Sequence, residues 1–250
     1  MKAEPAHVDY VIAITESGIC LIRQRRKSHF TPPQNCVCSF ERTMTQQLLL
    51  TAIDHFGKSG FDGASTRAIA SASGTAMSSI TYHYGGKKGL YLAAADHIAE
   101  SLSEGLGPIL ANAREHAAAP RNQAVETILL LLDGMATMML SPASEPWARF
   151  IIREQQQPTE AFERLYLGAM RDVTETLVAL VKRARPDLDD FEARATSIFL
   201  HGHALTLRAG RAAVHRVLGY ETLDDDVCQR LRKRLRVHAL RILTEEEVPS

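Results

Sequence analysis

The stretch SSITYHYGGKKGL, residues 78–90, gathers polar side chains that can bind phosphate. Two tyrosines flank His83, and two glycines separate them from Lys87 and Lys88. Phenol hydroxyls, imidazole and ammonium groups all donate hydrogen bonds to anionic oxygens. An apolar run follows at once, so these groups stand at the start of a helix. Their combination predicts a site that meets phosphate, as a nucleic-acid backbone would supply it.

The segments around this stretch are expected to be helices. Leu49, Ala52, Ile53 and Phe56 recur at i, i+3, i+4 and i+7, which predicts an amphipathic helix ending near Gly60. TRAIASASG predicts a short helix, AMSSITYHY predicts a second one after a tight turn, and KKGLYLAAADHIAESL begins a longer one. Two short helices joined by a glycine-containing turn form a helix-turn-helix, an arrangement that binds DNA.

The second short helix of such a unit lies in the major groove, with its first residues against base edges. Here these residues are Met77, Ser78 and Ser79, with Thr81 one turn further on. Serine and threonine hydroxyls can pair with several different bases, so they discriminate weakly. Arg67, at the start of the preceding helix, is therefore expected to be the sharper reader, with guanine as its preferred partner.

A separate set of side chains is expected to contact phosphate, which positions a protein without selecting sequence. This set is Thr66, Tyr82, His83 and Lys87. Thr66 is also expected to cap its helix, whose N-terminus attracts anions. For His83, a contact with phosphate and the absence of such a contact are equally good interpretations. Tyr84 is expected to fill the core of the head, and Lys88 to remain a solvated charge.

Composition places the chain among soluble globular proteins. It has 250 residues, of which 45% are hydrophobic, and its formal net charge is zero. Residues 1–92 carry ten Lys/Arg and six Asp/Glu, so the front of the chain is mildly basic and the remainder mildly acidic. Four cysteines make no disulfide framework at this length. With neither a secretion signal nor a long apolar run, we expect a cytoplasmic protein outside the membrane.

Residues 1–42 differ from the rest of the chain. Partial alternation in residues 8–22 could form a hairpin that turns at Ser17–Gly18. The preferred interpretation is a poorly ordered N-terminal extension, since the following residues read as loop. A zinc site is a further alternative, but its four candidates match no common ligand spacing, and we expect no metal. Those candidates are Cys20, His29, Cys36 and Cys38.

The rest of the chain is expected to be an all-helical body. Prolines at 108, 120, 142, 146, 158 and 186 divide it into apolar-periodic segments near 122–140, 146–155, 159–184, 190–213 and 224–243. Segment 122–140 is apolar around most of its circumference, so it should be the central helix. Segments 190–213 and 224–243 carry apolar stripes long enough to pack on a second copy as a four-helix interface.

A helical body can enclose a small-molecule pocket, and polar or aromatic residues in it are the candidate ligand-binding residues. These are Trp147, Phe150, Arg153, His201 and His203. For the first three, core packing and a salt bridge are an equally good interpretation. The two histidines are two positions apart on a helix, which argues against a shared metal and favours a helix interface. The basic face at residues 230–241 is expected to be solvated, with Leu231, Leu235 and Leu240 packed in a dimer; a second nucleic-acid site is the alternative.

Residues 45–92 resemble the DNA-binding domain of the TetR family of transcriptional regulators. The matching positions are Phe56, Gly60, Phe61, Thr66, Ile69, Ala70, Gly74, Tyr82, Lys87 and Leu90. Two later stretches, WARFIIREQQQPTEAFERLYLGAM and FLHGHALTLRAGRAAVHRVLGY, resemble the C-terminal domain of a TetR subgroup, the CerR-like regulators. The resemblance implies a three-helix head at residues 43–92 and a body for effector binding and dimerisation at residues 93–250.

The expected function is therefore that of a ligand-responsive regulator, a repressor, which binds a palindromic operator in double-stranded DNA as a homodimer. Its small-molecule effector is not indicated, and no cofactor is expected. A DNA-binding protein without an effector is the alternative, although a body of this size exceeds what that function needs. An enzyme is not expected, because the sequence has no glycine-rich phosphate loop, paired-carboxylate motif or nucleophile elbow, and hence no catalytic residues.

Overall fold

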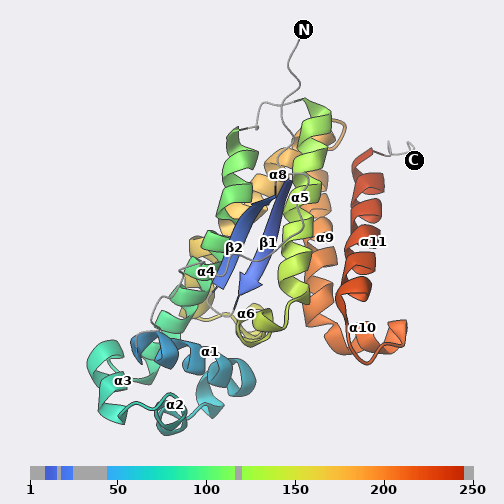
Figure 1. The fold of residues 1–250 in the computed structure, drawn as a ribbon. Helices are drawn as coiled ribbons and strands as arrows, with labels where there is room; N and C mark the ends of the chain where they lie inside the picture. The colour runs from blue at the N-terminus through green and yellow to red at the C-terminus, as the bar shows by residue number, and fades with distance from the viewer. Residues whose placement is uncertain (1–8, 16–17, 25–43, 116–119, 245–250) are drawn as a thin grey trace.

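The computed structural model describes residues 9–15, 18–24, 44–115 and 120–244. In chain order its elements are β1 (Asp9–Thr15), β2 (Gly18–Gln24), α1 (Met44–Gly63), α2 (Thr66–Ala72), α3 (Met77–Tyr84), α4 (Lys87–Glu115), α5 (Arg121–Leu140), the 3₁₀ turn η1 (Pro142–Ser144), α6 (Glu145–Gln156), α7 (Glu160–Leu165), the π-helical turn η2 (Tyr166–Met170), α8 (Arg171–Ala184), α9 (Asp190–Ala209), α10 (Arg211–Leu218) and α11 (Asp225–Thr244). The predicted all-α class is confirmed: these helices form a long bundle with a small head at one end (Figure 1).

The head consists of α1, α2, α3 and the first half of α4. One face of α1 is buried through Leu48, Ala52, Ile53 and Phe56, while Leu49 is only partly buried beside them. The helix bends at Gly60, whose φ of 71° lies in the left-handed region that glycine adopts without strain. The predicted stop is thus a kink, and one more helical turn follows it.

Helix α5 is the centre of the body, as its apolar circumference predicts. It packs against α4, α8, α9 and α11, and most of its side chains are buried. Length and composition alone would let α5 cross a membrane, but 72% of its apolar window is covered by the bundle. That burial is what the core helix of a helical domain shows.

Helix α4 belongs to both head and body, so the predicted boundary at residue 92 falls inside it. Proline 108 was expected to end a helix, and this expectation is wrong. The ring removes one backbone donor, yet Leu106, Leu110 and Ala113 on either side of it are buried in the body core. Packing of these side chains holds the helix together through the proline.

The predicted segment 159–184 is continuous but contains the π-helical turn η2 between α7 and α8. Gly168 lies in this turn, where an added Cβ would stand 2.7 Å from the Cβ of Ala99 on α4. The hydroxyl of Ser103, also on α4, donates to the carbonyl of Gly168 at 2.8 Å. The turn therefore brings this backbone directly against α4.

The predicted segment 190–213 is also divided, because α9 ends at Gly210 before α10 begins.

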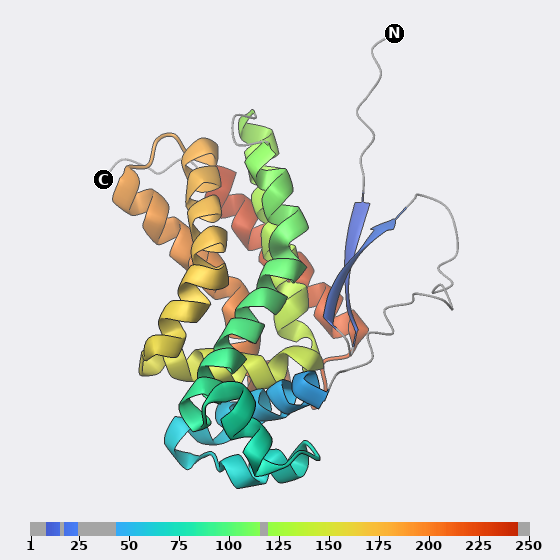
Figure 2. The same ribbon diagram turned by 90° about the vertical axis from the view of Figure 1, so that its left-hand side faces the viewer.

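The N-terminal extension contains a two-stranded hairpin. This is the alternative that the alternation in residues 8–22 indicates. β1 and β2 pair antiparallel, with Asp9 opposite Gln24 and Thr15 opposite Gly18. The hairpin lies beside α4 and α5 of the body and not beneath the head (Figures 1 and 2). Disorder of the extension as a whole remains a prediction. The side chains of the four zinc candidates fall outside the described residues.

Candidate nucleic-acid interface

A turn built by local hydrogen bonds sets the angle between α2 and α3. Ser65 is the N-cap of α2 and accepts from the backbone N–H of Ala68 at 3.4 Å, so Thr66 is the first helical residue and not the cap. After α2, Gly74 adopts a φ of 68° and Thr75 donates its backbone N–H to the Ala70 carbonyl at 2.9 Å. Ile69 and Ile80 are buried between the two helices and the rest of the head. The helix-turn-helix is therefore present where the sequence predicts it.

Helix α3 presents an exposed face beside its buried Ile80. Met77 is 46% exposed, and Ser78 and Thr81 are exposed near it, whereas Ser79 is half-buried. The N-cap, Ala76, makes no side-chain hydrogen bond to the first turn, so backbone amides there stay open to an external acceptor. Of the predicted base readers on α3, Ser79 is thus the least accessible.

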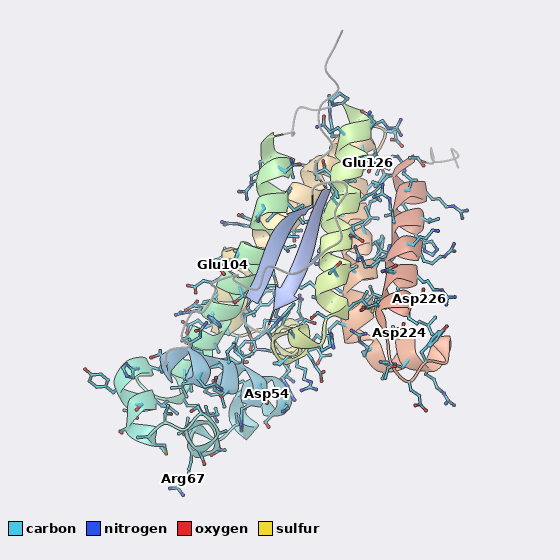
Figure 3. The ribbon with its side chains drawn as sticks, viewed as in Figure 1. Asp54, Arg67, Glu104, Glu126, Asp224 and Asp226 are labelled. Carbon is cyan, nitrogen blue, oxygen red and sulfur yellow. The ribbon has the colours of Figure 1, made fainter. Side chains whose placement is uncertain are left out.

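Arg67 and Tyr82 are exposed side chains of the head. Arg67, on α2, points away from the protein at the tip of the head (Figure 3). Tyr82 is 85% exposed, and its ring meets that of His83 edge-on at 5.0 Å between centroids. Tyr84 is half-buried, and burial raises the pKa of its phenol, which agrees with the expected packing role.

Lys87 is held against α1 more firmly than the sequence suggests. Its Nζ donates to the Asp62 carbonyl at 3.1 Å and lies 4.9 Å from the centre of the Phe61 ring. An ammonium has three donors, so the remaining ones can still reach a phosphate. Lys88 is solvated as expected, with a side chain that is 73% exposed; its Nζ also lies 2.9 Å from Oε2 of Glu160 at the start of α7.

Three of the predicted ligand-binding residues belong to the junction between head and body. Phe150 is fully buried and packs on Tyr91 with ring centres 4.6 Å apart, so it is a core residue and not a pocket wall. Arg153 donates from Nε to the Gly57 carbonyl at 2.8 Å and from one Nη to the Lys58 carbonyl at 2.7 Å. Trp147 is partly buried and touches both the head core and the body core.

Glu154 is a junction residue that sequence reasoning missed. The side chain is 2% exposed and accepts three hydrogen bonds, from the Tyr91 hydroxyl at 2.5 Å and from the Thr159 backbone N–H and hydroxyl at 3.0 and 2.9 Å. Burial and the neighbouring Glu154 raise the pKa of Tyr91. Its position four residues after Phe150 puts Glu154 on the same buried helix face, and this was the available signal.

Comparison with known proteins fits this geometry. Residues 48–94 match the family described as bacterial regulatory proteins, tetR family. Residues 124–245 match the C-terminal domain of the HTH-type transcriptional dual regulator CecR. The chain belongs to the TetR family of transcriptional regulators. The subgroup expected under the name CerR is that of CecR, and the relatives of this chain are regulators and not enzymes.

A curated TetR-type relative is the HTH-type transcriptional dual regulator CecR of Shigella flexneri. It is 28% identical over 201 residues, which cover 77% of this chain and 88% of the relative. Among solved structures, a TetR-family transcriptional regulator of Mesorhizobium loti aligns with a TM-score of 0.56 at 13% identity, covering 80% of this chain and 95% of that one. The fatty acid degradation regulator FadR of Bacillus halodurans aligns with a TM-score of 0.53 at 15% identity, covering 81% and 100%. At these identities the structures show the shared fold.

His201 and His203 lie on α9, apart from the three junction residues. Burial lowers the pKa of His201. Burial and the nearby His238 of α11 lower the pKa of His203, whose ring centre lies 6.4 Å from that of His238. The contact between His203 of α9 and His238 of α11 agrees with the predicted role at a helix interface. Within the described residues, no group of three or more His, Cys, Asp or Glu side chains could hold a metal.

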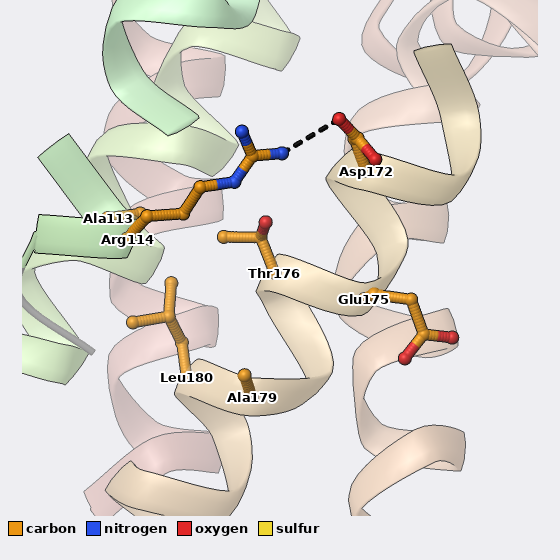
Figure 4. Close-up of a pocket in the computed structure, with 7 residues that line it drawn as sticks. All are labelled: Ala113, Arg114, Asp172, Glu175, Thr176, Ala179 and Leu180. Carbon is orange, nitrogen blue, oxygen red and sulfur yellow. Dashed lines mark hydrogen bonds and ion pairs between the residues drawn. The ribbon is translucent and has the colours of Figure 1, made fainter. Parts of the chain in front are cut away.

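An open groove of about 260 Å³ lies between the end of α4 and α8, at the far end of the body from the head. Arg114 and Asp172 form an ion pair of 2.7 Å across it, and Thr176, Ala179 and Leu180 lie along α8 (Figure 4). The predicted ligand-binding residues do not line this groove. A wider hollow of about 430 Å³ lies over Gly57, Lys58, Arg149, Ile152, Arg153 and Gln156 at the junction, so Arg153 alone of the five candidates borders a hollow described here.

Two further arginines escaped sequence reasoning. Arg208 donates from Nε to the Met139 carbonyl at 2.9 Å and also bonds the Ser141 carbonyl. Arg211 donates to the carbonyls of Met139 and Leu140 at 2.8 and 3.1 Å. Burial lowers the pKa of Arg208 to about 10, and the neighbouring cations Arg211 and Arg149 add to this effect. Both guanidinium groups satisfy the last carbonyls of α5, which no intrahelical donor reaches.

Proposed function

We propose that this TetR-family regulator is a repressor that binds a palindromic operator as a homodimer and responds to a small molecule. One observation carries the DNA-binding half of the proposal. The exposed faces of α2 and α3 stand in residues 63–95, a segment that contains Arg67, Lys87 and Lys88 but no Asp or Glu. A segment that contributes cations and no carboxylates favours contact with the phosphate backbone.

The roles of the head residues follow from their placement. Arg67 at the tip of the head is suited to reach a guanine edge, while Met77, Ser78 and Thr81 contact neighbouring bases through the exposed face of α3. Tyr82, His83, Thr66 and Lys87 surround this face and donate to phosphates. Ser79, being half-buried, supports the helix more than it reads bases.

The homodimer is supported by an uncovered apolar face on α9. Phe191, Ile198 and Phe199 are 78%, 63% and 67% exposed, and an added Cβ at Gly202 would meet nothing within 4 Å. Exposed apolar patches of this kind mark protein interfaces. Of the three α11 leucines expected at the interface, only Leu240 is exposed; Leu235 is buried and Leu231 half-buried in the core of the same chain. We therefore assign most of the interface to α9, with a smaller part for α11.

A TetR-family dimer of this kind presents two heads to successive major grooves, about 34–36 Å apart, which requires a palindromic operator. The relative CecR is named a dual regulator, so activation at some promoters is the second candidate. The effector response rests on the size of the helical body behind the head. The cytoplasm is the compartment that such a regulator needs in order to meet its operator.

Selection of operators from random-sequence duplexes tests this function. The purified protein should enrich an inverted repeat, and fluorescence anisotropy should give a complex at least about a thousandfold tighter than with scrambled DNA. A promoter–reporter fusion carrying the repeat then distinguishes repression from activation. A protein that enriches no repeat, or binds all duplexes alike, would refute the proposal.

A further inference from the structure

The last turn of α6 holds the head through two consecutive residues that reach in different directions. Arg153 donates to the carbonyls of Gly57 and Lys58 on α1, just before the kink at Gly60. Both carbonyls lie in the turn that leads into this kink, so Arg153 holds α1 at the point where the helix changes direction. Two parallel donors from one planar guanidinium fix an orientation as well as a distance.

Glu154 makes the second attachment. Its carboxylate receives the Tyr91 hydroxyl from α4 and both donors of Thr159, the N-cap of α7. All three partners are neutral, and burial of a carboxylate among neutral groups is expensive unless every acceptor is satisfied. An apolar side chain would fill the same space at lower cost. Because such a polar contact is costly, its role is better explained as fixing the geometry of α6 against its neighbours than as stabilising the fold.

The surrounding packing leaves α6 little freedom against the head. An added Cβ at Gly57 of α1 would lie 2.7 Å from the Pro146 carbonyl of α6, so the two backbones are in direct contact. Phe150, one turn before Glu154, packs on the Tyr91 ring that the carboxylate bonds. A shift of α6 must therefore move α1 and α4 together.

We propose that Arg153 and Glu154 are positioning residues that set the angle of the head on the body, and thereby the distance between the two heads of the dimer. The inference rests on the proposed function, since head separation matters only to a dimer on a two-part operator. Neither residue needs to touch DNA or effector.

The test compares a two-half-site operator with a duplex that carries one half-site. A dimer gains affinity for the full operator because its second head binds at high effective concentration, and this gain requires correct spacing. Arg153→Ala and Glu154→Ala should each lose about tenfold or more on the full operator while half-site affinity changes less than about twofold. Their preference for the native spacing over operators lengthened or shortened by one base pair should also flatten.

Conservative variants separate positioning from bulk stability. Glu154→Gln should keep more of the full-operator affinity than Glu154→Ala, because its amide oxygen can still accept from Thr159 although the Tyr91 hydroxyl loses its acceptor. Arg153→Lys should be intermediate, since one ammonium cannot reproduce the paired guanidinium bonds. Arg114→Ala is the matched control: it breaks an exposed ion pair between α4 and α8 far from the head.

Each outcome has one reading. If the wild type prefers no two-part operator, the proposed function fails before the variants are compared. If the wild type does prefer it and the alanine variants keep the wild-type ratio of full-site to half-site affinity, the positioning role is refuted. It is also refuted if both affinities fall together with the thermal midpoint, because that pattern reports an unfolded head.

Discussion

At the scale of single residues, Arg67 and Lys87 are predicted to have different roles in DNA binding. Arg67 is free at the tip of the head, whereas Lys87 is anchored to Asp62 and Phe61 behind α3. Arg67→Ala should therefore cost about 1–3 kcal/mol on the operator and relax the preference at one base position per half-site. Lys87→Ala should weaken all duplexes alike and lower the salt slope by about one per head.

Titration of both variants against operator and scrambled DNA at two salt concentrations checks this division. Lys87→Ala also removes a contact to α1, so its thermal midpoint must be measured beside the affinity. A changed base preference at an unchanged salt slope in Lys87→Ala would reverse the two assignments.

The half-buried imidazole of His203 should make stability depend on pH. Its pKa is lowered by burial and by His238, so the unfolded chain binds a proton that the folded chain resists. The stability it contributes is complete above the ordinary histidine pKa of about 6.5 and is lost as the pH falls from there towards the lowered folded value. Thermal melts across about pH 7.5 to 5 should show a smaller loss in His203→Gln than in the wild type.

A second variant gives this prediction an internal control. His238→Gln removes the smaller of the two causes that lower the pKa of His203, so its loss of stability should lie between those of the wild type and His203→Gln. Equal pH profiles in all three proteins would show that His203 titrates the same way folded and unfolded.

At the scale of elements, the α3–α4 corner depends on Gly89. An added Cβ there would lie 1.6 Å from the Tyr84 carbonyl oxygen, a backbone atom that cannot move without shifting α3. Gly89→Ala should thus cost about 1–3 kcal/mol of stability or more, and operator binding with it. Ser71→Ala on exposed α2 is the control, expected to change stability by less than about 0.5 kcal/mol. If Gly89→Ala and the wild type had equal thermal midpoints, α3 and α4 would separate enough to admit the added methyl group at no cost in stability.

The elements themselves were largely readable from sequence, since periodicity and glycine punctuation are local signals. The α1 stripe through Ile53 and Phe56, the turn at Gly74 and the apolar circumference of α5 all follow from neighbours in the chain. The corrections involve partners distant in sequence. For Arg153, nothing in the neighbouring sequence reveals that its donors reach α1. The neighbouring sequence does not reveal that Arg208 bonds the carbonyls of α5 either. Nor does it reveal that packing keeps Pro108 inside α4.

At the scale of the whole molecule, the extension is predicted to be dispensable for DNA binding. Its hairpin lies beside α4 and α5, away from the exposed face of α3 (Figure 2). Deletion of residues 1–42 should leave operator affinity within about tenfold of the full chain, or about 1.4 kcal/mol. Anisotropy and circular dichroism on the truncated protein check this. Loss of folding, or a larger loss of affinity, would give the extension a structural or DNA-contacting role.

DNA recognition by two heads depends on the proposed dimer, and the exposed apolar face of α9 offers a direct test of it. A carboxylate in place of Phe199 would be buried without a partner in the interface, which costs several kcal/mol. Phe199→Asp should therefore sediment as a monomer at micromolar concentration, keep its helical spectrum and half-site affinity, and lose its preference for the full operator. Leu167→Asp is the matched control, because Leu167 is 53% exposed on η2, away from α9. A Phe199→Asp protein that remains dimeric would place the interface on another face of the body.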